Sequence, residues 1–329
     1  MNRSIAAAAL ATAGLLGGAH APAAHAHAIA GARVFPVTLT IDDPGVADEA
    51  SIPTFTWQRQ GGDGGAGAVY QYTFGAEYDK RITERLALVL NDSYVVQSVQ
   101  GGKPRTGFQD LVGALKFRAY VNGPHEFILS LGVIREFGRT GTARIGADQY
   151  GNTTPTLYFG KGLGDLPIGP LRALAVTGTA GFLIADRELK ASNPPPDLTA
   201  NATAPITGIA TQQFNNGYSN RWVGGLSVQY NVPYLQSQVR DVGLRGAFGH
   251  LVPIVELAYS SPASAPSNLG TQLVLAPGIL YEGRSYQLGV EALIPANKAL
   301  GTNVGVIAQF HLFLDDLFPN SLGKPLFNF

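Results

Sequence analysis

Apolar and polar side chains alternate along most of this chain with a period of two. The alternation is clearest in the stretch 302–314, where every second residue from Val304 to Leu312 is apolar. The residues between them are largely polar until Phe313. A period of two with one apolar face is typical of a β-strand whose two faces meet different surroundings. At about eleven residues, the stretch is long enough to cross a bilayer at a tilt.

A strand that crosses a bilayer requires a closed sheet. Each backbone N–H and C=O group inside the membrane must find a partner within the protein, and a strand finds these partners only beside other strands. A barrel leaves no strand edge unpaired. The pattern therefore predicts an all-β fold, a single transmembrane antiparallel β-barrel.

About twelve stretches of the chain have this strand-like pattern. In the second of them, one row of side chains runs from Tyr70 to Tyr78 and is mainly aromatic, whereas the other row is mainly polar. Aromatic residues near the ends of such stretches are typical of the two membrane interfaces. The predicted strands are 52–60, 68–79, 86–98, 107–121, 125–138, 153–163, 171–186, 217–231, 250–260, 271–282, 285–295 and 302–314.

The connections between these strands alternate between short and long. With both chain termini in the periplasm, the even-numbered connections are inner turns, which are short in such barrels. Two inner connections, 164–170 and 232–249, are longer than this rule prefers. The remaining examples follow it: short inner turns at 80–85, 122–124 and 283–284, and long outer loops at 139–152 and 187–216.

The N-terminus has the pattern of an export signal. Arg3 is followed by an apolar run over 5–18 and by two A-x-A sequences that end at Ala26 and Ala28. We expect a cleaved signal peptide over 1–28, which removes the three histidines of that stretch from consideration as metal ligands. The expected organisation then continues with a periplasmic lead-in or plug segment (29–50), the barrel (51–316) and a periplasmic C-terminal tail (317–329).

Composition narrows the class of protein further. The chain has 329 residues, no Cys, 14% charged residues and a formal net charge of zero. Soluble proteins average about 25% charged residues, and no apolar run after the N-terminus reaches the roughly 18 residues that a membrane helix needs. The absence of a basic stripe argues against nucleic acid as a partner. We therefore expect a bacterial outer-membrane location, with membrane lipid, the barrel assembly machinery and a small-molecule solute as partners.

The last predicted strand also resembles the C-terminal recognition signal of bacterial outer-membrane barrels. That signal has a polar residue, a glycine and two aromatic residues at fixed spacing, which here correspond to Asn303, Gly305, Ala308 and Phe310. Ala308 departs from the pattern. The chain ends on Phe329, a terminal residue that is typical of such proteins.

The last third of the chain carries short motifs in a recognisable order. They are P-I-V-E at 253–256, L-A-P-G-I-L-Y at 275–281, Q-L-G-V-E at 287–291 and A-Q-F-H-L-F-L-D-D at 308–316. In this order they resemble the outer-membrane proteins of the phenol-degradation meta-pathway family, which are described as transporter-like. The resemblance implies a barrel of about twelve strands that passes small organic molecules, with an aromatic solute suggested by the name of the family.

The polar rows of the predicted strands contain the candidate residues of a solute path. In a narrow barrel these charges must pair or stay hydrated. They either orient a solute or form an ion-pair network that fills the lumen. Glu256, Glu291 and His311 could share one sector of the lumen. The complete set is Glu77, Asp110, Lys116, Arg118, Glu126, Glu136, Arg221, Glu256, Glu291, Gln309 and His311.

An enzyme is the rival interpretation of such a barrel. Outer-membrane lipid hydrolases use a Ser–His pair with a polar orienting group. After signal cleavage only His125, His250 and His311 are left, and His311 has no serine at the second following position. No G-x-S-x-G motif and no H-E-x-x-H metal motif is present. We therefore expect no enzyme, no metal and no cofactor.

The function expected from the sequence is passive passage of small, uncharged or weakly polar organic molecules. The predicted lumen row carries both signs of charge in near balance, whereas an ion-selective porin would carry a one-sided ring. A channel for apolar solutes would need an apolar lumen patch or an N-terminal plug, for which residues 34–50 are the candidate. The alternatives are a closed structural barrel and an outer-membrane lipid hydrolase.

The alternation predicts that Phe310 faces lipid. Phe310→Asp would place a carboxylate at bilayer depth, at a cost of up to about 3 kcal/mol that depends on depth. We expect loss of the heat-modifiable folded band in outer-membrane fractions. A normal amount of folded protein would mean that Phe310 does not face the bilayer.

Overall fold

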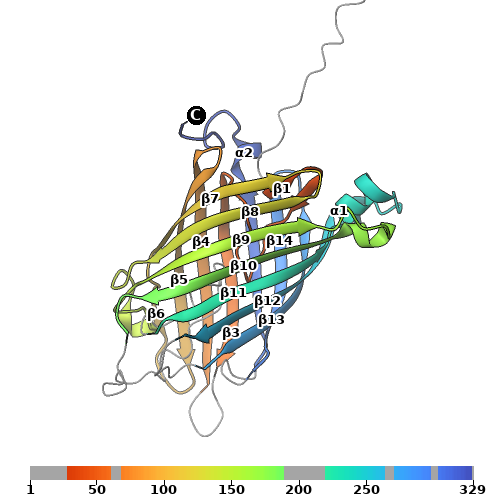
Figure 1. Cartoon of the computed structure of the whole chain (residues 1–329). Helices are drawn as coiled ribbons and strands as arrows, with labels where there is room; N and C mark the ends of the chain where they lie inside the picture. Colours follow the sequence, from red (N-terminus) through yellow and green to blue (C-terminus); the bar gives the residue numbers. More distant parts are fainter. Residues whose placement is uncertain (1–27, 61–67, 189–218, 264–269, 298–302, 328–329) are drawn as a thin grey trace, which may run out of the picture.

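The computed structural model describes residues 28–60, 68–188, 219–263, 270–297 and 303–327. Twelve strands in these ranges form one closed antiparallel barrel (Figure 1). The first barrel strand, β3, pairs with the last, β15, so that the sheet closes on itself. The predicted fold class is therefore confirmed. Within the described residues, no helix has the length and apolar character needed to cross a membrane.

Each barrel strand pairs with its neighbours in sequence, and three short strands accompany the barrel. The short strands are β1 (Ala28–Ala30) and β2 (Arg33–Phe35), which form a hairpin, and β6 (Arg105–Phe108). The barrel strands are β3 (Glu49–Gln60), β4 (Val69–Thr83), β5 (Leu86–Val99), β7 (Val112–Asn122), β8 (Phe127–Glu136), β9 (Asn152–Gly162), β10 (Leu174–Ala185), β11 (Arg221–Tyr230), β12 (Leu251–Pro262), β13 (Gln272–Glu282), β14 (Tyr286–Pro295) and β15 (Gly305–Phe313).

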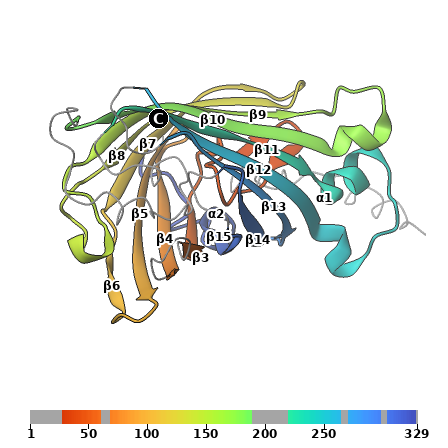
Figure 2. The same ribbon diagram turned by 90° about the horizontal axis from the view of Figure 1, so that it is seen from below.

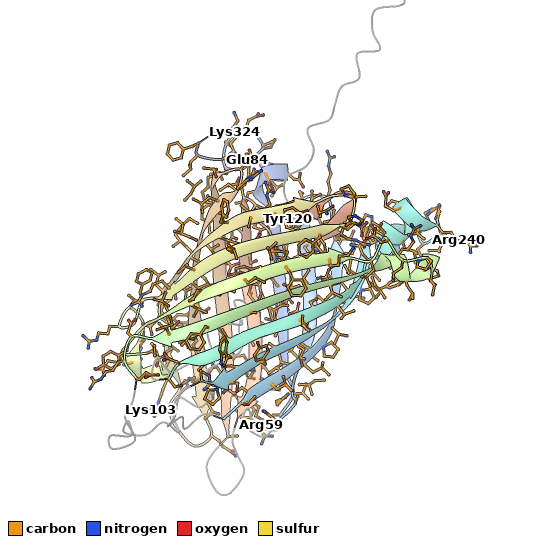
Figure 3. The ribbon with its side chains drawn as sticks, viewed as in Figure 1. Arg59, Glu84, Lys103, Tyr120, Arg240 and Lys324 are labelled. Carbon is orange, nitrogen blue, oxygen red and sulfur yellow. The ribbon has the colours of Figure 1, made fainter. Side chains whose placement is uncertain are left out.

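The two faces of the barrel wall have opposite character. Along β11, Trp222 and Leu226 are exposed on the outside, whereas Gln229 is completely buried inside. The outer face therefore carries the apolar row and the lumen carries the polar row, as the alternation predicts. Aromatic and aliphatic side chains project from the outside of the strands in Figure 3. Tyr158 departs from the expectation that aromatic residues near strand ends lie at a membrane interface, because it is fully buried in the lumen.

The predicted strand 107–121 is broken into two pieces. β6 pairs with residues 94–97 of β5, and β7 pairs with residues 86–91 of the same strand. Asp110 lies in the break, where its carboxylate accepts backbone N–H groups of Thr140, Gly141 and Asp148. The polar residue at this position thus holds the loop between β8 and β9 instead of continuing the lumen row.

The barrel has two distinct ends, here called the turn end and the loop end. The turn end carries the short connections 84–85, 123–126 and 283–285, and lies at the top of Figure 1 beside the described C-terminal residues. The loop end carries the connection 137–151, which includes the helical turn η1 (Ala143–Ile145). Short turns mark the periplasmic end of such barrels. The predicted outer loop 187–216 lies almost entirely outside the described residues.

The two long inner connections fold together into what we call the side lobe, residues 163–173 and 232–250. It contains the short helical turns η2 (Gly169–Ala173), α1 (Val232–Tyr234), η3 (Leu235–Val239) and η4 (Gly246–His250). Asn231 starts α1 because its side chain accepts the backbone N–H of Tyr234 at 2.7 Å. The side lobe projects sideways from the turn end, at the right of Figure 1.

The described C-terminal residues return to the first strands of the barrel. After β15 the chain forms α2 (Leu314–Leu317) and then runs alongside the end of β4. Lys80 donates to the carbonyl oxygens of Leu322 and Lys324, and Arg81 donates to that of Gly323. The tail is thus hydrogen-bonded to the barrel rim at the turn end.

Candidate functional site: the barrel lumen

The lumen wall has an apolar side and a neutral polar side. The inward residues of β12 to β15 include a buried aliphatic cluster with Ile254, Leu280 and Ile307, and buried polar side chains such as Glu256 and Glu291 lie on the same strands. The inward residues of β9 to β11 are hydroxyl and amide side chains such as Thr156, Thr177 and Gln229, which are also buried. A molecule inside the barrel would therefore meet apolar surface on one side and neutral hydrogen-bonding groups on the other.

A segment without regular secondary structure lies between these two sides. It comprises residues 36–48, here called the lumenal segment, and connects the β1–β2 hairpin to β3. Every residue in it is buried except Asp42, which is half-buried. The red N-terminal stretch lies inside the ring of strands when the barrel is viewed from below (Figure 2). This location explains why the 34–50 region has apolar residues but no long strand pattern.

Glu256 is the main anchor of the lumenal segment. Its carboxylate accepts the backbone N–H groups of Leu39 at 3.1 Å, Thr40 at 2.6 Å and Ile41 at 2.8 Å. Backbone N–H groups that converge on one carboxylate make charge-assisted hydrogen bonds, which are stronger than neutral ones. The central wall strand β12 is thereby bonded directly to the backbone of a segment more than 200 positions away in sequence.

β14 adds two further contacts on the same side of the lumen. Glu291 accepts the hydroxyl of Thr40 at 2.7 Å. Gln287 accepts the backbone N–H of Val37 at 3.1 Å and donates to the carbonyl oxygen of the same residue at 2.7 Å. Thr40 therefore contacts two wall strands at once, β12 through Glu256 and β14 through Glu291.

The opposite wall holds the other half of the lumenal segment. Lys116 of β7 makes an ion pair with Asp42 at 2.9 Å and donates to the carbonyl oxygen of Asp43 at 3.2 Å. Ser130 of β8 donates to the carbonyl oxygen of Pro44 at 2.7 Å. The segment therefore crosses the lumen from β12–β14 to β7–β8, and side chains of the wall hold it at both sides.

The lumenal segment also covers the apolar side of the wall. Leu39 and Ile41 are both completely buried and belong to the same cluster as the inward residues of β12 to β15. Burial of a leucine or isoleucine side chain contributes about 1.5–3 kcal/mol. The segment thus satisfies polar wall groups with its backbone and apolar wall groups with its side chains.

The predicted lumen residues divide among several clusters. Glu256 and Glu291 come together through Thr40, and Lys116 meets the same segment from across the lumen. His311 does not join them, because it bonds to Ser51 and Glu49 instead. All three residues come from β12, β14 and β15 on the same side of the barrel, but the histidine belongs to a separate hydrogen-bonded cluster.

The other candidates lie at the rims or against neighbouring strands. Arg118 is half-buried at the turn end and donates to the carbonyl oxygen of Glu84 in an inner turn. The remaining four contact wall or loop groups: Glu77 accepts from Asn91, Gln309 donates to Thr54, Arg221 donates to Ser260 and Glu136 accepts from Asn152.

Glu126 joins three elements at the turn end. It precedes β8 and has a positive φ of 49°, an uncommon conformation for a residue other than glycine. Its carboxylate accepts from Arg33 of β2 at 3.1 Å, from the Tyr234 hydroxyl at 2.5 Å and from the Gly164 backbone at 3.1 Å. The Arg33 guanidinium lies 3.4 Å from the centre of the Tyr234 ring. This cluster fixes the β1–β2 hairpin against the side lobe.

The lumenal segment ends in a second ionic cluster at the turn end. Asp48 pairs with Lys80 at 2.5 Å and with Arg81 at 2.6 Å. Arg81 also lies 3.6 Å from Asp315 of α2. Burial raises the pKa of Asp315 to about 7, against the opposing effect of the Arg81 guanidinium. The end of the lumenal segment and the C-terminal tail therefore share the same cationic side chains.

Ser51, His311 and Glu49 form a hydrogen-bonded chain with the composition of a hydrolase triad. The Ser51 hydroxyl lies 2.8 Å from His311 Nδ1, and Glu49 lies 3.2 Å from Nε2. In serine hydrolases the serine meets Nε2 and the carboxylate meets Nδ1, which is the reverse of this order. Ser51 is also only 2% exposed. The chain therefore fits a structural bond across the β15–β3 pairing better than a nucleophile.

Sequence analysis missed several residues that hold the lumenal segment. Thr40 and Asp42 were assigned only to a possible plug, Gln287 was named only as part of the Q-L-G-V-E motif, and Ser130 was not named. The parity of Ser130 and Gln287 along their strands places them on the lumen side, which was a usable signal. Their partner could not be derived, because the contacts join distant parts of the chain. Among the described residues, no group of three or more His, Asp or Glu side chains is arranged to hold a metal ion.

Comparison with known proteins identifies the architecture. No protein-family model and no curated protein matches this sequence. The structure is similar to a COG4313 outer membrane channel from Pseudomonas putida F1, with a TM-score of 0.50 and 10% identity over 85% of this chain and 96% of that one. It also matches the translocator domain of the autotransporter NalP from Neisseria meningitidis, with a TM-score of 0.41 and 9% identity over 80% and 87% of the two chains.

The first of these similarities shows the fold of the chain: it has the barrel architecture of that solved structure, of which nearly the whole chain is covered. The specific resemblance to the phenol-degradation meta-pathway family is not confirmed by any family model.

The hydrogen-bonded chain at the β15–β3 pairing leads to a stability prediction. His311→Ala would leave Ser51 and Glu49 without their partner in a buried site, at about 1–3 kcal/mol for each unsatisfied group. We expect the temperature at which the folded gel band unfolds to fall, and to fall less for Ser51→Ala. Ester hydrolysis should be the same background in all three proteins. Loss of hydrolysis in Ser51→Ala would instead support an enzyme.

Proposed function

We propose that the protein is a bacterial outer-membrane channel that passes small, uncharged or weakly polar organic molecules. The observation that carries the proposal is the lumenal segment. The space between the two walls is occupied by an irregular segment that is held mainly by side-chain hydrogen bonds. A segment bound in this way can leave without any change in strand pairing, which makes it suitable as a gate.

The outer-membrane location has support from several features. The outer face of the barrel is apolar along its strands, and a closed antiparallel barrel is the β architecture that satisfies every backbone group in lipid. The N-terminal pattern of an export signal agrees with this location. Similarity to a solved outer-membrane channel supports the same assignment at the level of the fold.

The character of the wall supports the class of solute. With the segment in place, Lys116 pairs with Asp42 and Glu256 accepts backbone N–H groups, so withdrawal leaves only a few polar wall groups free to bind a solute. When the segment withdraws, Leu39 and Ile41 leave an apolar surface on β12 to β15. A solute with an apolar body and few polar groups would replace those two side chains. An aromatic solute meets this description, as the family resemblance suggested.

Two other roles compete with this proposal. A closed structural barrel would use the same contacts to fill the lumen permanently. A lipid hydrolase would use Ser51, His311 and Glu49, but the reversed ring order and the burial of Ser51 weigh against it. Transport measurements separate the first alternative from a channel.

Removal of the lumenal segment should open the barrel. We propose deletion of residues 29–47, which keeps Asp48 and its bonds to Arg81. Proteoliposomes with the deleted protein should swell in arabinose and in an aromatic glucoside faster than those with the intact protein. Protein-free liposomes set the background, and a heat-modifiable gel band verifies folding. If neither protein passes any solute, the channel function is wrong and the structural role stands.

A single substitution of the anchor residue Glu256 should also raise the swelling rate. Glu256→Gln keeps the side-chain volume but removes the charge that three backbone N–H groups share. Charge-assisted bonds contribute roughly 1.5–3 kcal/mol each, so the bound state of the segment should lose on the order of 3–5 kcal/mol. We expect swelling rates between those of the intact and deleted proteins. The matched control is Glu136→Gln near the loop end, which should behave as the intact protein does.

A swelling rate in Glu256→Gln that equals the intact rate, together with a fast rate in the deletion, would show that Glu256 does not control the segment. Equal rates in the intact protein and the deletion would show that the segment is no barrier.

A further inference from the structure

A row of aromatic rings crosses the outer face of the barrel at the turn end. Ring centres of His250 and Tyr281 lie 5.5 Å apart, those of Tyr281 and Tyr286 lie 6.1 Å apart, and those of Tyr286 and Phe310 lie 6.2 Å apart. Aromatic residues of membrane barrels gather at the level of the lipid headgroups. This row therefore marks the membrane interface on the periplasmic side.

The side lobe begins where this aromatic row ends. His250 is both the last ring of the row and the final residue of η4 in the lobe. Its Nδ1 atom lies 2.9 Å from the carbonyl oxygen of Glu282, the last residue of β13, which fixes η4 against the barrel wall. Because the aromatic row marks the membrane interface, the side lobe is held at the level of the headgroups, and it projects sideways from the barrel (Figure 1).

The surface of the side lobe is unusually apolar for a connection outside the membrane. Phe248 is 68% exposed, more than the outward Trp222 of the barrel wall at 55%. Exposed apolar patches of this kind mark interaction sites. The patch comes from both connections of the lobe and consists of Ile168, Leu171, Val242, Leu244 and Phe248.

The charges of the side lobe and the adjoining Lys161 leave two uncompensated cations. Lys161 pairs with Asp165 at 3.0 Å, and Arg245 pairs with Asp241 at 2.7 Å. The hydrogen bond from Arg245 lowers the pKa of Asp241 to about 2, so this pair is ionised at neutral pH.

Among the lobe's own residues, all of which the structure describes, Arg172 and Arg240 are the arginines without a carboxylate partner. Arg172 donates to the carbonyl oxygen of Gly164, and Arg240 lies at the outer end of the lobe in Figure 3. Two arginines beside an apolar patch match the chemistry of an anionic amphiphile.

A hollow on the lobe lies next to the apolar patch. Its volume is about 400 Å³, and its lining includes Gln236, Asp241, Leu244, Arg245 and His250. The hollow thus combines one aliphatic side chain with groups that hydrogen-bond, and its one carboxylate, Asp241, is paired with Arg245. It offers room for a polar headgroup beside side chains that contact an acyl chain.

We infer that the side lobe binds anionic phospholipid of the periplasmic leaflet, with its apolar side chains among the acyl chains and with Arg172 and Arg240 beside the phosphates. The surface is continuous with the membrane face of the barrel through the aromatic row, which favours lipid over a protein partner. The inference rests on the membrane location in the proposed function. It does not depend on solute passage.

Lipid binding to the purified full-length protein tests this inference. The protein is held in a neutral detergent, and binding of phosphatidylglycerol and phosphatidylcholine is measured by native mass spectrometry. We expect the anionic lipid to bind more tightly. Arg172→Ala combined with Arg240→Ala should weaken phosphatidylglycerol binding by roughly five-fold for each arginine and leave phosphatidylcholine unchanged. Phe248→Ser should weaken the binding of both lipids.

The control is Lys103→Ala combined with Arg105→Ala, which removes the same number of positive charges at the loop end. It should leave the binding of both lipids unchanged. Arg240→Ala alone is the second variant. A heat-modifiable band confirms that every variant is folded, and unchanged solute swelling separates this test from that of the channel.

Three results would overturn the inference. The first is equal affinity of the intact protein for the two lipids. The second is unchanged phosphatidylglycerol binding in both arginine variants. The third is evidence for another ligand. Displacement of the lipid by millimolar inorganic phosphate would point to a soluble anion, and capture of a protein in cells by a photocrosslinker at position 248 would point to a protein partner.

Discussion

The pairing between β3 and β15 is the contact on which the rest of the structure depends. Until these two strands meet, each presents an unpaired edge, and an unpaired backbone group in lipid costs several kcal/mol. The pairing is irregular, because the register shifts between Gln309 and His311. Ser51 and His311 bridge the two strands from inside at this irregularity. The strand pairing that closes the barrel is therefore also the place where lumen-facing side chains of the first and last barrel strands bond to each other.

A closed wall creates a second requirement, because its inward polar groups are removed from bulk water. Burial of an ionised carboxylate costs several kcal/mol, and attraction from a single partner seldom offsets that cost. Glu256 is satisfied by three backbone N–H groups instead of by a cation. The same stretch of backbone positions Leu39 and Ile41 against the apolar wall. One short segment therefore meets both requirements of the interior without forming a helix or a strand.

The wall could be derived from sequence, whereas the contents of the lumen could not. Strand periodicity depends only on neighbouring residues, so the predicted strands 86–98 and 271–282 nearly coincide with β5 and β13. The break at Asp110 was missed because its cause is the loop 139–148, which lies in a different connection. The position of His311 apart from Glu256 likewise depends on strand register and on a segment that joins β3. The alternation of apolar and polar residues gives neither the register between strands nor the contacts of that segment.

The route of the lumenal segment has a topological consequence. The segment enters beside the β1–β2 hairpin at the turn end and leaves at Asp48, which is bonded to Arg81 at the same end. It is therefore a loop folded into the barrel from one side and not a strand threaded through it. It can therefore leave the lumen toward the periplasm without breaking any strand pairing of the barrel. A mechanical force on the N-terminus would consequently remove the segment from the lumen before it separated the strands of the sheet.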